Sequence, residues 1–164
     1  MNLFDEYSAL ENAVIATPEF RARGFDVVGD ASRVVAAQER AAKVLADVGL
    51  AGKEGVKAKS LSYGERRALE IGVALAADPK LLFLDEPTAG LGAEGLARVA
   101  DLIGRLRGRL TLVVIEHDMR FLFGLADRIS VVHWGQVIAR GTPSELKANP
   151  WVQRSALAQN VVPV

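Results

Sequence analysis

The chain lacks several features that would indicate common classes of protein. Its 164 residues include no cysteine, which excludes a disulfide framework, a thiolate metal site and a cysteine nucleophile. The two histidines are too few for a histidine metal cluster. The 20 basic and 20 acidic residues cancel, so the net charge does not indicate a nucleic-acid partner. No apolar run approaches the ~18 residues of a membrane span. The hydrophobic content of 50% instead favours a globular domain with a sizeable core.

The stretch from Leu81 to Pro87 is the centre of the prediction. Its four bulky apolar residues fit a strand buried on both faces of a parallel sheet, and two carboxylates follow where that strand leaves the core. The carboxyl ends of strands in open α/β sheets face the ligand crevice, where P-loop NTPases hold Mg²⁺ with an aspartate. Asp85 is therefore the candidate metal ligand, and Glu86 the candidate that orients water. The alternative is a buried strand followed by a solvated acidic turn.

A second apolar run, 110–115, predicts another buried strand, and polar residues again follow it. These are Glu116, His117 and Asp118. A lone histidine at a strand end is more often structural than functional. The position of His117 parallels that of Asp85 and Glu86, however, and this favours a functional role.

A helix of largely apolar sequence, 66–77, is preceded by Leu61-Ser62-Tyr63-Gly64-Glu65. Ser62 and Gly64 stand at its amino end, where free N–H groups and the positive end of the helix dipole favour an anion. Anion recognition and a plain helix cap are both consistent with this pattern.

The remaining pattern predicts alternating helices and strands around these motifs. Helices are expected at 8–15, 31–48, 96–106 and 119–126, with a surface loop at 20–30 between the first two. A third strand at 129–133 turns through Trp134-Gly135-Gln136 into 137–139, and Thr142 has the spacing of a helix cap. A weakly patterned tail follows from Trp151.

The ordered set of 61–65, 81–86 and 115–118 resembles the ATP-binding subunits of ABC transporters. Ser62, Tyr63, Gly64 and Glu65 match the family's signature loop, Asp85 and Glu86 match its Walker B aspartate and catalytic glutamate, and His117 matches its switch histidine. The D-loop falls on 88–92, where Gly92 replaces the usual aspartate. Finer details are similar to the branched-chain amino acid importers: Tyr63-Gly64-Glu65, the 89–91 turn, the 116–119 run and Gly141-Thr142-Pro143. Lipopolysaccharide-export and urea-type subunits share many of these sequence motifs.

The resemblance implies an α/β fold with the parallel-sheet core of a P-loop NTPase of the ABC ATPase type. It implies a helical subdomain and connector at 1–60, a core with signature helix, Walker B and switch histidine at 61–141, and a helical tail at 142–164. It implies ATP and Mg²⁺ as cofactors, with Asp85 holding the metal through water, Glu86 acting on the attacking water and His117 contacting the γ-phosphate. The signature loop would complete the nucleotide site of the opposite subunit in a head-to-tail dimer. Transmembrane permease subunits would place the protein at the inner face of the cell membrane.

The family's P-loop is missing from these residues. A P-loop requires Gly-x-x-x-x-Gly-Lys followed by Ser or Thr, whereas Gly52-Lys53 is followed by Glu54 and has Asp47 at the first glycine position. We therefore expect the N-terminal third of the family domain to be absent. We also expect an exposed apolar edge at the strand of Leu81 and no useful ATPase activity of the chain alone.

Two other hypotheses about the function of the chain remain open. The chain could be a catalytically inactive module that donates its signature loop to an intact ATPase subunit. It could also be an unrelated doubly wound α/β domain, such as a phosphoacceptor, but this reading leaves the signature-like loop and His117 unexplained.

Overall fold

The computed structural model describes residues 3–22, 31–150 and 152. They form two compact units: Met1–Leu84 with Ala89–Val113 (unit 1), and Asp85–Thr88 with Val114–Val164 (unit 2). Part of the predicted surface loop and nearly all of the tail from Trp151 lie outside the described residues. Within the described part of the chain, no helix is both long and apolar enough to cross a bilayer.

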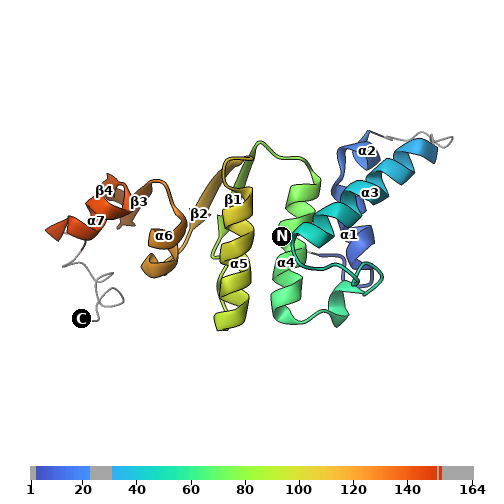
Figure 1. Ribbon diagram of the computed structural model, residues 1–164, viewed down its shortest axis with the longest axis horizontal. Helices are drawn as coiled ribbons and strands as arrows, with labels where there is room; N and C mark the ends of the chain where they lie inside the picture. The colour runs from blue at the N-terminus through green and yellow to red at the C-terminus, as the bar shows by residue number, and fades with distance from the viewer. Residues whose placement is uncertain (1–2, 23–30, 151, 153–164) are drawn as a thin grey trace. The chain divides into compact units, whose positions relative to one another are not determined.

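The amino-terminal part of unit 1 contains four α-helices: α1 (Ala9–Ala16), α2 (Pro18–Arg21), α3 (Ala31–Asp47) and α4 (Tyr63–Ala76). α1, α3 and α4 pack against one another, as Figure 1 shows in blue to green. Gly72 allows α4 to lie close to the end of α3, because a Cβ there would stand 3.2 Å from a methyl group of Val48, the residue that follows α3. A short 3₁₀ helix, η1 (Ala58–Ser60), leads toward α4. The predicted helices at 8–15 and 31–48 are therefore confirmed.

Two strands and a helix follow: β1 (Leu81–Asp85), α5 (Ala93–Leu106) and β2 (Thr111–Ile115). β1 and β2 pair as a two-stranded sheet. They run parallel, because Thr111 N–H donates to Lys80 O at their amino ends and Glu86 N–H donates to Ile115 O at their carboxyl ends. α5 buries the apolar face predicted for it, on Val99, Leu102, Ile103 and Leu106. The predicted α/β class with a parallel sheet is confirmed.

The expectation that β1 is buried on both faces is wrong for this chain. Leu82 and Leu84 are buried, but Leu81 is 48% exposed and Phe83 62% exposed. β2 shows the same difference, since Val113 and Ile115 are exposed as well. In the described residues this sheet has two strands, and nothing covers one of its faces. This exposure concerns one face of the sheet, whereas the expectation from the sequence concerned an exposed apolar edge.

Unit 2 continues with α6 (Met119–Leu125), β3 (Ile129–His133), β4 (Gln136–Gly141) and α7 (Pro143–Ala148). β3 and β4 form an antiparallel hairpin in which Ile129 pairs with Gly141 and His133 with Gln136. Its turn residues Trp134 and Gly135 both have positive φ, as a two-residue type I′ turn requires. The core of this unit consists of Ile129, Val131, Leu146 and Val152.

Candidate functional site

The carboxyl end of β1 holds an acidic residue in a strained conformation. Asp85 is the last residue of the strand and is exposed. Glu86 follows with a φ of 43°, in the left-handed region that non-glycine residues rarely adopt. Its N–H donates to Ile115 O at 2.9 Å, while the next residues, Pro87 and Thr88, are buried. Such strain costs about 1–3 kcal/mol and clusters at functional sites.

His117 lies beside Glu86, as the parallel strands predict. The imidazole Nδ1 is 3.7 Å from Glu86 Oε1, and both side chains are well exposed, at 71% for His117 and 56% for Glu86. Glu86 and His117 both belong to unit 2. The structure therefore brings together the two residues that were expected to act on a common group.

Glu116 and Thr88 form a contact at this site that the sequence did not reveal. Glu116 Oε1 accepts hydrogen bonds from Thr88 N–H at 2.9 Å and from Thr88 Oγ1–H at 2.6 Å. The Glu116 side chain is fully buried, and its Oε2 has no hydrogen-bond partner among the described residues. The only indication in the sequence that Glu116 has a role at this site was its position directly after an apolar strand. His117 and Asp118 share that kind of position, so it did not single out Glu116.

The third polar residue of this run has a local role. Asp118 is the N-cap of α6, and its Oδ1 accepts from Arg120 N–H at 2.9 Å and Phe121 N–H at 3.1 Å. Asp118 therefore uses one carboxylate oxygen to begin a helix.

The amino end of α4 is a complete capping box. Ser62 Oγ accepts from Glu65 N–H, and the Glu65 carboxylate accepts from Ser62 N–H at 2.9 Å. Glu65 also pairs with Lys53, and this contact, followed by the bonds to Ser62, lowers the pKa of Glu65 to about 2. Because Ser62 Oγ is the acceptor in the cap, its own hydrogen remains available for an anion.

Tyr63 connects this helix start to the turn after β1 within unit 1. Its hydroxyl donates to Ala89 O at 3.1 Å. The next residue, Gly90, has a φ of +71°, and a Cβ there would meet the Tyr63 ring at 3.1 Å. Glycine is thus required at this position both by the backbone angle and by the space that Tyr63 leaves.

The predicted residues therefore form two groups. Ser62, Tyr63, Gly64 and Glu65 belong to unit 1, whereas Asp85, Glu86 and His117 belong to unit 2. Within residues 3–22, 31–150 and 152, no cluster of three His, Asp or Glu side chains has the arrangement of a metal site. One exposed aspartate at a strand end nevertheless fits Mg²⁺, which usually binds through one or two carboxylates together with substrate phosphates.

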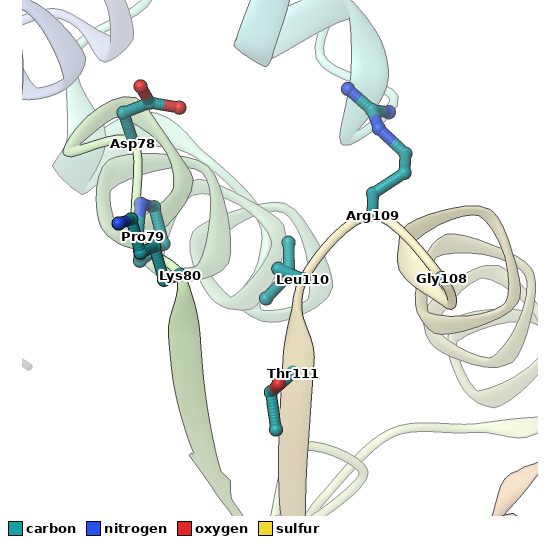
Figure 2. Close-up of a pocket in the computed structure, with 7 residues that line it drawn as sticks. All are labelled: Asp78, Pro79, Lys80, Gly108, Arg109, Leu110 and Thr111. Atoms are coloured by element: carbon teal, nitrogen blue, oxygen red, sulfur yellow. The ribbon is translucent and has the colours of Figure 1, made fainter.

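A hollow of about 550 Å³ lies at the other ends of the same strands. It is lined by Asp78, Pro79, Lys80, Gly108, Arg109, Leu110 and Thr111. Figure 2 shows Thr111 at the start of β2 and Leu110 just before it, with the charged groups of Asp78 and Arg109 extending away from the strands. None of the predicted site residues lines this hollow, so the chemistry indicated by the sequence belongs to the carboxyl ends of β1 and β2.

Comparisons with known proteins agree with this geometry. Residues 1–89 match the family model described as ABC transporter. The chain is 35% identical to LivG of Salmonella typhimurium, a high-affinity branched-chain amino acid transport ATP-binding protein, across 97% of this chain and 65% of LivG. BraF of Pseudomonas aeruginosa, which has the same description, is 34% identical with the same coverage. A crystal structure of MJ1267, an ATP-binding cassette of an ABC transporter, in its ADP conformation superimposes with a TM-score of 0.71 at 25% identity, over 90% of this chain and 61% of that cassette. The chain thus spans slightly less than two thirds of the length of these relatives.

Proposed function

Because this chain belongs to the ABC transporter family, we propose that it serves in the ATP-binding subunit of a transporter that imports branched-chain amino acids. The observation that supports this most strongly is the proximity of Glu86 and His117 at the carboxyl ends of two parallel strands. Both relatives named above are described as ATP-binding proteins of branched-chain amino acid transport. Permease subunits in the membrane would then be partners, and the protein would work at the inner face of that membrane.

Glu86 and His117 divide the chemistry in this proposal. The Glu86 carboxylate orients and polarises the water that attacks the γ-phosphate, and His117 contacts that phosphate. General-base assistance of this kind contributes about 10²–10⁴-fold in rate. Asp85 would hold Mg²⁺ through water, and the ion supplies positive charge that stabilises the phosphoryl group during transfer. The strained backbone of Glu86 and its bond to Ile115 O fix the start of that side chain relative to β2.

Ser62, Tyr63, Gly64 and Glu65 contribute to the nucleotide site of the opposite subunit in this proposal. A helix dipole supplies only about 0.3–1 kcal/mol at an exposed site, so phosphate recognition also requires N–H groups and the Ser62 hydroxyl. Ser62 and Tyr63 are exposed, and the capping box holds the end of α4 in a fixed shape. Glu65, with both oxygens engaged, keeps this shape and is not itself a phosphate ligand.

The chain alone is expected neither to bind ATP tightly nor to hydrolyse it at a useful rate, because its sequence contains no P-loop. Calorimetric titration with Mg·ATP should therefore detect no micromolar binding. Micromolar affinity together with turnover that Glu86→Gln abolishes would contradict this expectation.

The proposed activity can be tested by supplying the P-loop. The chain is joined to a Walker A-containing amino-terminal segment from a relative, and ATP turnover of this joined protein is measured. Glu86→Gln should reduce turnover by about 10²-fold or more, and His117→Ala should also reduce it strongly. Glu94→Gln is the matched control, because Glu94 is an exposed carboxylate on α5 that pairs only with Arg98 in the described structure. Turnover that is insensitive to Glu86→Gln would refute the role of Glu86.

The alternative of an inactive module that donates its signature loop is not favoured by relatives described as ATP-binding proteins. It makes a separate prediction, namely that the unmodified chain raises the turnover of a full-length ATP-binding subunit. Ser62→Arg should then remove the gain and Glu86→Gln should leave it. Absence of any gain counts against the module.

A further inference from the structure

The buried carboxylate of Glu116 has two oxygens in different situations. Oε1 accepts both the N–H and the hydroxyl hydrogen of Thr88, whereas Oε2 has no hydrogen-bond partner in the described part of the chain. His117 Nδ1 lies 3.9 Å from this second oxygen. All three residues belong to unit 2.

We propose that Glu116 is a positioning residue for His117, which keeps the imidazole hydrogen on Nδ1 by offering Oε2 as its acceptor. A buried acceptor left without a hydrogen-bond donor is destabilising, so a hydrogen directed at Oε2 is favoured. The distance of 3.9 Å exceeds that of a formed hydrogen bond, and such contacts often tighten only when substrate binds.

Thr88 determines which oxygen is available. Its two donors hold Oε1, so the carboxylate cannot turn to present both oxygens to the ring. Which nitrogen of a histidine carries hydrogen is set by the partner of the other nitrogen. With Nδ1 assigned to Glu116, Nε2 is the nitrogen left for a substrate group, and this consequence rests on the function proposed above.

Glu86 is the competing partner of His117 Nδ1, at 3.7 Å. The Glu86 carboxylate is 56% exposed and in contact with water, and exposed pairs of this kind contribute little. Glu116 is fully buried and has no water-facing alternative. Glu116 is therefore expected to decide the tautomer, although Glu86 is slightly nearer.

Long-range proton–nitrogen NMR correlations of the imidazole rings test this inference on the chain as it exists. The spectra are recorded at alkaline pH, because only a neutral imidazole has two tautomers. His117 should carry its hydrogen mainly on Nδ1. His133, the other histidine, lies at the end of β3 and is an internal reference that should show the Nε2–H form favoured by free histidine.

Glu116→Gln should reverse the tautomer of His117. The glutamine oxygen would accept from the two Thr88 donors, so the amide NH₂ would face Nδ1 and donate to it. His117 should then shift from largely Nδ1–H to largely Nε2–H. Glu86→Gln is the matched control and should leave the tautomer unchanged. The Thr88 amide signal reports whether the Glu116 contact and the local fold persist in each variant.

Two results would overturn the proposal: an Nε2–H tautomer of His117 in the unmodified chain, or an unchanged tautomer in a folded Glu116→Gln variant. Should that variant not fold, Glu86→Gln decides the question: Nδ1–H that persists without the Glu86 carboxylate supports the role of Glu116, and a shift to Nε2–H counts against it. The measurement needs no nucleotide. An inactive joined protein with the expected tautomer would therefore count against the proposed function and leave the role of Glu116 intact.

Discussion

The start of α4 and the carboxyl ends of β1 and β2 carry the two groups of predicted residues, and they are built in opposite ways. At the start of α4, Ser62 and Glu65 hydrogen-bond to each other's backbone N–H groups, and Lys53 pairs with the Glu65 carboxylate. At the strand ends, Glu86 has a strained backbone, and a buried oxygen of Glu116 has no hydrogen-bond partner among the described residues. The helix start is completed by residues close in sequence. The strand ends hold polar groups in costly arrangements, which is typical of a site that a substrate completes.

Glu116→Ala, at the strand ends, is expected to change the free energy of unfolding more than any other substitution considered for the two regions. The substitution leaves both Thr88 donors without their charged acceptor, and relief of the buried charge offsets only part of this loss. The free energy of unfolding should fall by about 2 kcal/mol. Chemical denaturation measures the change, with Glu94→Ala on α5 as the exposed control. A loss no greater than that of the control would show that the Thr88–Glu116 contact is not formed in solution.

The strain at Glu86 can be tested by comparing two replacements of this residue. Glycine adopts the left-handed region without the Cβ clash that costs other residues about 1–2 kcal/mol. Glu86→Gly should therefore be more stable than Glu86→Ala by about 1 kcal/mol, and both variants lack the carboxylate. Equal denaturation midpoints for the two variants would mean that the φ of 43° does not persist in solution.

An effect of similar size on the free energy of unfolding is expected at the helix start. Ser62→Ala removes one acceptor from a capping box and should cost about 1 kcal/mol of unfolding free energy. Thr142→Ala is a matched comparison, since Thr142 forms the same kind of box with Glu145 at α7. If Ser62→Ala has no effect while Thr142→Ala does, the α4 cap is not a self-sufficient structure and the contrast between the two regions weakens.

The smallest expected effect is the contribution of Glu65 to the pH dependence of the free energy of unfolding. Lys53, followed by the Ser62 bonds, lowers the pKa of Glu65 from 4.5 to about 2. The ionised folded form is favoured, so this contribution is fully present above pH 4.5 and is lost as the pH falls toward about 2. Water screens the pair, so the contribution should stay below about 1 kcal/mol. Glu65→Gln should flatten the stability–pH curve in this window, and an unchanged curve would show that the pairing is absent.

The sequence predicted most of the local structure because local residues determine it. Ser8 and Thr142 cap helices with glutamates three residues later, as their spacing indicates. The parallel strands and the proximity of Glu86 and His117 followed from apolar runs that end in polar residues.

The exposure of Leu81 and Phe83 could not be predicted in the same way. An apolar run indicates burial, but whether a second layer is present depends on residues distant in sequence. The burial of Glu116 likewise depends on Thr88, 28 positions away. Long-range partners of this kind leave no periodic signal.

Turnover of mixed variants of the joined protein tests most directly whether the two regions serve one nucleotide site. Ser62→Arg and Glu86→Gln are each expected to inactivate the protein alone. In a head-to-tail dimer, a mixed pair combines Glu86 of one copy with Ser62 of the other and so contains one intact site of two. Random pairing makes half of the dimers mixed, so the mixture should recover up to about a quarter of the unmodified turnover. A mixture that stays as inactive as its components would contradict the account.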